Sequence, residues 1–497
     1  SELAFGHVGI GAREEQRFVL FHEGSTSRPL TVYNAWLAEP DAVHFSTDFE
    51  GPVTLQPGES LIVGVRFAPQ ASGAWTSPLY LSHDGASGLE VFTLSGSAGE
   101  MSAGQRRRAL VEDRLRRARP DFDKSTLSGI GNIKPTSLQF GPDGRLYVAD
   151  MFGTIRIYTV ERRGANDYAV EATETIQSIR DIANHDDDGD PAPNVKNRLV
   201  TGLLVAGSAS QPVMYVASSD PRIGGGHSHT NTNLDTNSGV ISRLTRDGDG
   251  WTKVDLVSGL SRSEENHHPN GMALDAATNR LYVSVGGNTN QGATSNNFAM
   301  LPEFALSAAI LEIDLGRIGE STYDLPTLDD ETRDGAHDRN DPFGGNDGRN
   351  QAKLVPGGPV QVYAPGFRNA YDVVLTESGR MYSIDNGPNG NWGGRPVGEG
   401  PGGNCTNAQY EPSVTYHDSL HHITGRGYYG GHANPTRGNL ANTFNKSNPQ
   451  SPVSVANPIE CDYHPAGGQA ALTTFGTSVN GMVEYRASNF GGAMQGD

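Results

Sequence analysis

One short pattern recurs along the last three quarters of this 497-residue chain. A turn that holds Gly, Asp or Asn leads into an apolar strand with a tyrosine, at 140–150, 211–218, 279–286 and 377–385. Strand repeats with drifting, insertion-rich spacing are typical of β-propeller blades. We interpret these segments as four inner-strand units of a propeller over residues 125–497, with the polar insertions between them placed on loops.

The composition agrees with an all-β fold. Hydrophobic residues make up 35% of the chain and charged residues 19%, while Gly occurs 63 times and Pro 29 times. These values favour many turns between short strands over disorder. The length exceeds that of one ordinary domain, and about seven short apolar runs within residues 1–100 predict a separate β-sandwich.

Three local patterns in the first hundred residues resemble ASPM/Hydin-like immunoglobulin-type modules. They are the opening Leu-x-Phe-Gly at 3–6, the Leu-x-Pro-Gly-Glu turn at 55–59 and the Val-x-Phe-x-Pro run at 65–69. The resemblance implies an immunoglobulin-like β-sandwich that acts as a spacer or an adhesive unit.

Residues 101–124 differ from their surroundings, because arginines alternate there with apolar residues at helical spacing. We expect a basic helix or linker between the two domains, or a basic segment that lies on the acidic propeller. The formal net charge of the chain is −19, which argues against a nucleic-acid partner. No apolar run approaches the length of about 20 residues that a transmembrane helix needs.

The most informative pair of side chains is Arg368 and Asn369, which follow the apolar strand 360–363. A guanidinium group offers forked donors and an amide offers both a donor and an acceptor, so the pair suits a planar anionic ligand rich in carbonyl groups. Alternatively, the arginine pins neighbouring blades by bonding to their carbonyl groups. The next strand ends at 386–388 in Asn-Gly-Pro.

These residues resemble the soluble PQQ-dependent glucose/sorbosone dehydrogenase family, whose cofactor segment carries a G-x-R-N run and then a strand that ends in Q-G-P. The resemblance implies a six-bladed propeller in which Arg368, Asn369 and Asn386 bind PQQ. It also implies that the carbonyl groups of Gly387 and Pro388 hold a Ca²⁺ ion beside the cofactor, and calcium readily accepts carbonyl ligands.

A family H-x-x-G run supplies the base that removes the sugar hydroxyl proton, and His268 matches it within Asn-His-His-Pro-Asn-Gly at 266–271. Imidazole suits this role because its pKa lies near neutrality. The chain departs from the family at Gly287, where an Asp would orient the base. His268 could instead cap a blade turn.

The chain ends as it approaches a further blade strand, at 489–497. We therefore expect an incomplete last blade, without the family's C-terminal basic clamp on the cofactor, and another chain or segment that completes it. An uncovered strand edge is unfavourable.

An acidic loop at 184–190 gathers Asp186, Asp188 and Asp190 around a Gly turn. Repulsion among these carboxylates favours a bound Ca²⁺ ion, although the loop lacks the Glu of an EF-hand. The alternative is a solvated acidic loop.

The chain has two cysteines, Cys405 and Cys461, which flank an insertion rich in Gly, Asn and Pro. A disulfide would staple this loop, whereas two free thiols would not. We expect the disulfide, and with it an extracellular or periplasmic protein, possible also at the cell surface.

Two functions follow from these observations. The first is an exported PQQ-dependent sugar dehydrogenase, which transfers a hydride from a sugar hydroxyl to PQQ with Ca²⁺. The second is a non-catalytic propeller that serves as an extracellular adhesin, a carbohydrate-binding protein or a structural subunit. We expect a sugar or polysaccharide as a partner, and the sequence leaves open whether the chain is an enzyme.

Overall fold

The computed structural model describes residues 2–22, 28–38, 41–57, 59–85, 88–99, 124–187, 189–328, 351–442, 451–464, 471–476 and 478–486. Contacts divide these residues into two compact units, 2–99 and 124–486. The basic segment expected at 101–124 lies outside the described residues except for its last position. No helix among the described residues is long and apolar enough to cross a membrane.

The first unit is a β-sandwich, as the alternating apolar runs predict. One sheet has the order β1-β8-β7-β3-β5 and the other the order β2-β6-β4. In β6, Val63, Val65 and Phe67 are fully buried while Ile62 and Arg66 face out, which is the period of two of a strand with one buried face. The strands are β1 (Glu2–Gly9), β2 (Glu14–Phe21), β3 (Leu30–Leu37), β4 (Phe45–Thr47), β5 (Val53–Leu55), β6 (Ser60–Phe67), β7 (Gly73–His83) and β8 (Leu89–Gly99).

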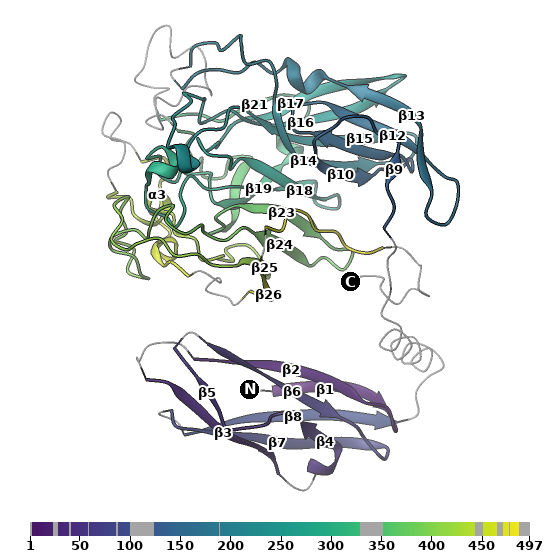
Figure 1. Cartoon of the computed structure of the whole chain (residues 1–497), viewed down its shortest axis with the longest axis vertical. Coiled ribbons are helices and arrows are strands. Elements are labelled where there is room, and N and C mark those ends of the chain that lie inside the picture. The colour runs from purple at the N-terminus through teal and green to yellow at the C-terminus, as the bar shows by residue number, and fades with distance from the viewer. Residues whose placement is uncertain are drawn as a thin grey trace. The chain divides into compact units, whose positions relative to one another are not determined.

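The second unit contains four antiparallel sheets in sequence order, each an up-and-down meander (Figure 1). This arrangement confirms the all-β class and the propeller architecture. Within the described ranges there are four such sheets, so the six blades that the resemblance implies are not reached there.

The first two sheets each gain a short parallel strand at the outer edge. The first sheet comprises β10 (Pro135–Phe140), β11 (Leu146–Asp150), β12 (Ile155–Arg162), β13 (Tyr168–Ile176) and β9 (Leu127–Ser128), and the second comprises β14 (Leu199–Gly207), β15 (Pro212–Ser219), β16 (Gly239–Asp247), β17 (Gly250–Leu260) and β21 (Tyr323–Asp324). The third sheet comprises β18 (Pro269–Asp275), β19 (Arg280–Val285), β20 (Ala309–Asp314) and β22 (Val360–Pro365), and the fourth comprises β23 (Ala370–Leu375), β24 (Met381–Asp385), β25 (Asp418–Ile423) and β26 (Thr473–Phe475).

The recurring sequence unit occupies the second strand of each sheet, which corrects its interpretation as the innermost strand. The four units fall on β11, β15, β19 and β24. The first strands β10, β14, β18 and β23 instead pack against one another from sheet to sheet. Apolar clusters fill the space between successive sheets, and one such cluster contains both Tyr147 of β11 and Val216 of β15.

Glycines let the innermost strands approach closely. A Cβ atom at Gly202 in β14 would lie 2.0 Å from the backbone oxygen of Asn270 in β18. A Cβ atom at Gly271 would likewise lie 2.2 Å from the Oδ1 atom of Asp372 in β23. Any side chain at these two positions would therefore push neighbouring sheets apart.

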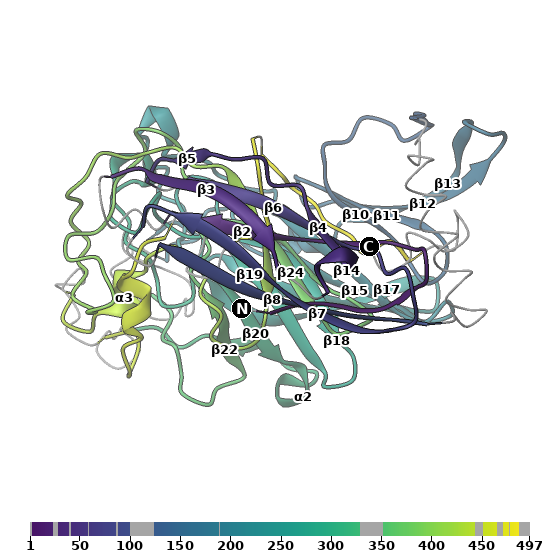
Figure 2. The same ribbon diagram turned by 90° about the horizontal axis from the view of Figure 1, so that it is seen from below.

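The Cys405–Cys461 disulfide joins the loop between β24 and β25 to the loop between β25 and β26, which confirms the expected pairing. Both cysteines are fully buried. The short helix α3 (Pro435–Gly438) lies among these loops at the edge of the unit, as Figures 1 and 2 both show. The loop after β25 packs against one end of the third sheet, where Asn434 and Arg437 donate to backbone oxygens of the 304–308 loop.

Residues 478–486 run alongside β23 without belonging to a sheet. The backbone nitrogen of Met482 donates to Asp372 at 2.9 Å, and the nitrogen of Glu377 donates to Glu484 at 3.0 Å. The Asn-Gly-Met at 480–482 repeats the Asn-Gly-Met at 270–272 in the innermost strand β18. The remaining C-terminal segment, at 487–497, lies outside the described residues.

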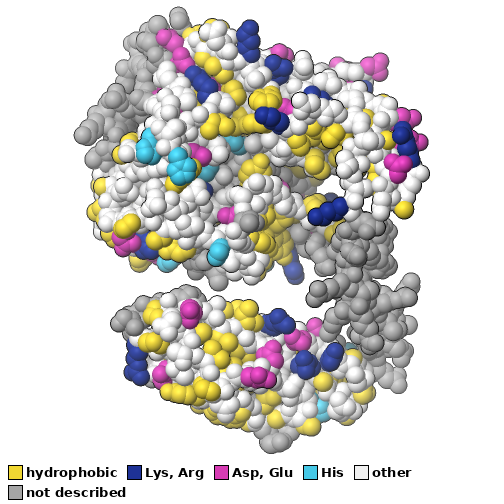
Figure 3. All heavy atoms as spheres, in the orientation of Figure 1, with side chains coloured by type: hydrophobic (Ala, Val, Ile, Leu, Met, Phe, Trp, Pro, Cys, Tyr) yellow, Lys and Arg dark blue, Asp and Glu magenta, His cyan; other side chains and the backbone are white. Residues whose placement is uncertain are grey.

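Charged side chains of both signs share the surface. On the face that Figure 3 draws, acidic and basic groups form small separate clusters between polar and apolar atoms. The net charge of −19 is therefore not gathered into one acidic field on that face.

Candidate functional site

The predicted ligand-binding residues lie at one end of the third and fourth sheets because of strand direction. The innermost strand β23 starts just after Arg368 and Asn369, and its antiparallel partner β24 ends at Asp385. Ala370 pairs directly with Asp385, so the start of one strand meets the end of the other. The same geometry places His268, just before β18, at the corresponding end of the third sheet.

Asp385 fixes the backbone of the Arg368-Asn369 pair. Its two carboxylate oxygens accept the backbone N–H groups of Arg368 at 3.0 Å and of Asn369 at 2.7 Å. Burial raises the pKa of Asp385 to about 6, and these hydrogen bonds oppose part of that rise. Both oxygens of the Asp385 carboxylate therefore hold the backbone of the loop, and the carboxylate forms no ion pair with the guanidinium group of Arg368.

The Arg368 side chain is buried without a counter-ion. It is 5% exposed, and it forms no ion pair with any residue that the structure describes. Its Nε atom donates to Asn290 at 3.2 Å and its Nη1 atom to the backbone oxygen of Asn386 at 3.5 Å, which leaves Nη2 without a partner among the described residues. Burial lowers the pKa of Arg368, and the nearby Glu265 charge opposes this shift. A buried cation of this kind favours an anionic ligand.

Side-chain amides lie around the Arg368-Asn369 pair. Asn270 donates from Nδ2 to Asn369 Oδ1 at 3.0 Å, while its own Oδ1 atom is buried without a partner among the described residues. The Asn386 side chain already has a partner within the protein, because its Oδ1 atom accepts a hydrogen bond from the Ser478 hydroxyl at 2.8 Å. The Asn270 oxygen is therefore a stronger candidate for a ligand contact than the Asn386 amide.

Backbone oxygens crowd around Gly387. A Cβ atom there would lie 2.6 Å from the carbonyl oxygens of both Tyr416 and His417, so the position requires glycine. The Gly387 nitrogen donates to Asp418 at 2.9 Å, and the Pro388 oxygen accepts the Tyr416 nitrogen at 3.3 Å. Carbonyl and carboxylate oxygens of this kind are the ligands that calcium prefers.

His268 is buried beside β14, and hydrogen bonds define its tautomer. The Thr201 hydroxyl donates to the Pro269 oxygen at 3.0 Å, so its oxygen accepts from Nδ1 of His268 at 2.9 Å. The proton thus sits on Nδ1, and Nε2 carries the free lone pair. Burial, with the positive charge of Arg262, lowers the pKa of His268 to about 3. The imidazole is neutral throughout the physiological range.

The imidazole beside Arg368 is that of His267, which sequence reasoning passed over. Its Nδ1 atom donates to the Gly287 oxygen at 2.8 Å, and its Nε2 atom lies 3.7 Å from a Glu265 oxygen. The His267 ring and the Arg368 guanidinium both lie against Phe298, with centres 5.3 and 5.9 Å away. Burial, with the Arg368 charge, lowers the pKa of His267 well below its ordinary value.

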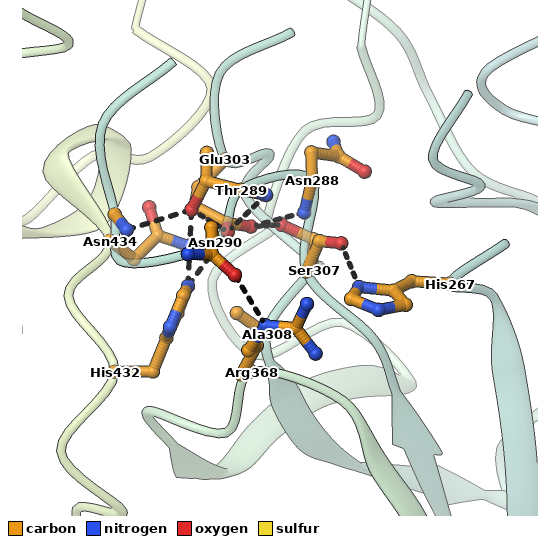
Figure 4. A network of polar contacts seen from close by, with 12 residues as sticks. His267, Asn288, Thr289, Asn290, Glu303, Ser307, Ala308, Arg368, His432 and Asn434 are labelled. Carbon is orange, nitrogen blue, oxygen red and sulfur yellow. Dashed lines mark hydrogen bonds and ion pairs between the residues drawn. The ribbon is translucent and has the colours of Figure 1, made fainter. Parts of the chain in front are cut away.

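A buried glutamate occupies the space next to Gly287. A Cβ atom at that position would lie 2.6 Å from Oε1 of Glu303, so the Asp expected there from the family pattern has no room. The Glu303 carboxylate accepts hydrogen bonds from Thr289 and from Nε2 of His432 at 2.9 Å, and Figure 4 shows this network beside Arg368. The Glu303 carboxylate therefore binds His432, whereas His268 has the Thr201 hydroxyl as its hydrogen-bond partner.

The acidic loop is only partly described. Asp186 accepts the guanidinium of Arg222 at 2.5 Å, and Asp190 is exposed. Asp188 lies outside the described residues. The residues that the structure does describe contain no group of three His, Cys, Asp or Glu side chains placed to hold a metal ion.

No family model and no curated protein matches the sequence. Among solved structures, the chain resembles a Trichoderma reesei enzyme of carbohydrate-active family AA12, in its iodide structure, at 14% identity and a TM-score of 0.35. It also resembles the holo PQQ domain of pyranose dehydrogenase from Coprinopsis cinerea, at 13% identity and a TM-score of 0.34.

These alignments cover 62% and 63% of this chain, and this chain spans 57% of the AA12 enzyme's chain and 58% of the PQQ-domain chain. A PapD-like domain of human CEP192 matches 20% of the chain at 13% identity and a TM-score of 0.17, with 82% of that domain covered. Likenesses of this size establish no family for the chain.

Proposed function

We propose that the second unit is a quinoprotein-type propeller that binds PQQ and oxidises a sugar. The observation that carries the proposal is Arg368, a buried guanidinium that has a free Nη2 donor and no ion pair with a described residue. PQQ is a planar anion rich in carboxylate and carbonyl groups, which fits this donor and the orphaned Asn270 oxygen nearby. Asn369 and Asn386 would hold the surrounding loop in shape.

PQQ would supply the hydride acceptor, and the protein would supply position and proton transfer. His268 would accept the sugar hydroxyl proton at Nε2, because its Nδ1 proton is fixed by Thr201. The carbonyl groups of Gly387 and Pro388 would hold Ca²⁺ close to the cofactor. A second Ca²⁺ ion at Asp186, Asp188 and Asp190 would order the acidic loop.

One observation favours the non-catalytic alternative, an extracellular carbohydrate-binding or adhesive propeller. A base works best when its pKa lies near the operating pH, whereas burial lowers the pKa of His268 to about 3. Its partner is the Thr201 hydroxyl and not a carboxylate, so an imidazolium ion would gain little support.

The disulfide supports export to the periplasm or the cell exterior, since such bonds persist in oxidising compartments. The first unit would act as an immunoglobulin-type spacer, with residues 101–124 as the linker.

Reconstitution with PQQ and Ca²⁺, followed by dye reduction on a panel of aldoses, tests the proposal. The enzyme reading predicts turnover that requires added PQQ and disappears in His268→Ala while PQQ remains bound. If PQQ-loaded protein reduces no dye with any aldose but still binds sugars, the non-catalytic function stands instead.

A further inference from the structure

A pocket of about 450 Å³ opens at the end of the first sheet, and its lining includes none of the residues assigned above to PQQ. Its walls come from the segment before β10, the end of β11, the start of β12 and the turn between them, the turn at 177–181 and the segment before β14. A volume of this size falls within the range of small-molecule sites and exceeds what a single inorganic ion fills.

Hydrogen bonds to Asp150 fix the turn that forms part of the pocket wall. Asp150 accepts the backbone N–H groups of Phe152 at 2.9 Å and of Lys134 at 3.0 Å, which fixes both segments. Gly153 has φ +88°, and a Cβ atom there would lie 2.9 Å from Cγ of Arg180. Glycine at this position therefore lets the Arg180 side chain lie over the turn.

Three cations line the pocket against one carboxylate. Asp150 pairs with Arg156 at 3.5 Å, which accounts for its charge. The Lys134 ammonium lies over the Phe152 ring at 5.2 Å, and the Arg180 guanidinium forms no hydrogen bond or ion pair with any described residue. In a chain whose net charge is −19, two positive charges without a carboxylate thus face one pocket.

The rest of the lining suits a sugar. Asn132, Gln177 and Asn197 line the pocket, and side-chain amides can both donate to and accept from hydroxyl groups. Phe152 is 39% exposed, and an aromatic ring offers an apolar face to a pyranose ring. We propose that this pocket binds an acidic saccharide, with the uronate carboxylate held by Arg180 and Lys134. This site is independent of PQQ and of the proposed dehydrogenase activity.

The test is isothermal titration calorimetry on the whole chain at low salt, with trigalacturonate as the acidic probe and maltotriose as the neutral one. The wild type should bind trigalacturonate about tenfold or more tightly than maltotriose, because each lost charge-assisted bond weakens binding by about that factor. Arg180→Gln and Lys134→Gln should each lose about tenfold, and added salt should weaken wild-type binding.

Arg163→Gln is the matched control, because Arg163 is exposed, lies outside the pocket and pairs with Glu161 at 2.9 Å. It should bind like the wild type. Melting temperatures should not change in the two pocket variants, since neither side chain has an ionic partner to leave behind.

Four results would overturn the proposal. Unchanged binding in both pocket variants would place the saccharide elsewhere. Equal affinity for maltotriose, or no binding of trigalacturonate at all, would show that the pocket does not recognise an acidic saccharide. Inorganic phosphate that binds as tightly as trigalacturonate would show a simple anion site instead of a sugar site.

Discussion

Replacing Glu303 with Gln should destabilise the second unit by about 3 kcal/mol. The carboxylate is fully buried and accepts five hydrogen bonds, three at Oε1 and two at Oε2. A glutamine amide keeps one acceptor oxygen and turns the other into a donor. If the amide nitrogen replaces Oε2, it faces the backbone N–H of Asn288, which donates at 3.0 Å in the wild type.

One orphaned backbone donor costs about 1–3 kcal/mol, and the loss of charge at the remaining bonds costs about 1 kcal/mol each. The cheaper burial of a neutral amide offsets part of this sum. The assay is urea unfolding followed by Trp251 and Trp392 fluorescence, in a background where Trp36 and Trp75 are Phe. Glu320→Gln is the control, because that side chain is 81% exposed and its loss should cost less than about 0.5 kcal/mol.

The same pair of proteins should show a defined pH dependence. Burial alone would raise the pKa of Glu303, but hydrogen bonds from His432, Ser307 and Thr289 outweigh it and hold the pKa below the ordinary value of 4.5. A lowered folded pKa contributes stability above the unfolded pKa, and that contribution is lost as the pH falls through the folded pKa. The advantage of the wild type should therefore be constant near neutrality and shrink below pH 4.5. Equal stability at neutral pH, or an advantage that persists unchanged in acid, would refute the reasoning.

Three further outcomes are expected. Replacing Cys405 and Cys461 with Ser should lower the free energy of unfolding by about 2–4 kcal/mol, since the bond closes a loop with a sequence separation of 56; unchanged melting in reductant would contradict this. Gly202→Ala should cost more than about 2 kcal/mol in urea unfolding, because its Cβ would lie 2.0 Å from a backbone oxygen, whereas Gly164→Ala has room and should cost little. If His268 is the base, turnover should be independent of its titration between about pH 5 and 8, because burial lowers its pKa to about 3 and it is neutral there; an inflection near 6.5 would show a different base.

The sequence predicts the all-β architecture because its strongest signals are local. Turn residues followed by Leu-Tyr or Met-Tyr strands mark β11, β15, β19 and β24 directly. The innermost strands carry Gly and polar residues where neighbouring sheets meet, as at Gly202 and Gly271, so their pattern is weak. Their place at the centre becomes visible only in three dimensions.

Site residues can be predicted from the sequence where a distinctive side chain also stands at a recognisable place, such as the end of a strand. Arg368 and Asn369 stand out because an Arg-Asn pair follows a strand, and the only two cysteines leave one possible bond. Glu303 has no such signal, because it is a single glutamate in a loop that reaches His432 across 129 positions.

The adjacent histidines His267 and His268 also could not be told apart from the sequence. Their sequence does not say which ring faces Arg368, because neighbouring residues point to different sides of the chain. The structure places His267 near Arg368 and turns His268 toward Thr201.

The central claim is that Arg368 binds an anionic quinone cofactor. Equilibrium titration of the whole chain with PQQ and Ca²⁺, followed by the absorbance of the cofactor, tests it most directly. The account predicts saturable binding to the wild type and to Arg163→Gln, and binding about 10- to 100-fold weaker to a folded Arg368→Gln. No binding to the wild type, or equal binding to Arg368→Gln, would contradict it.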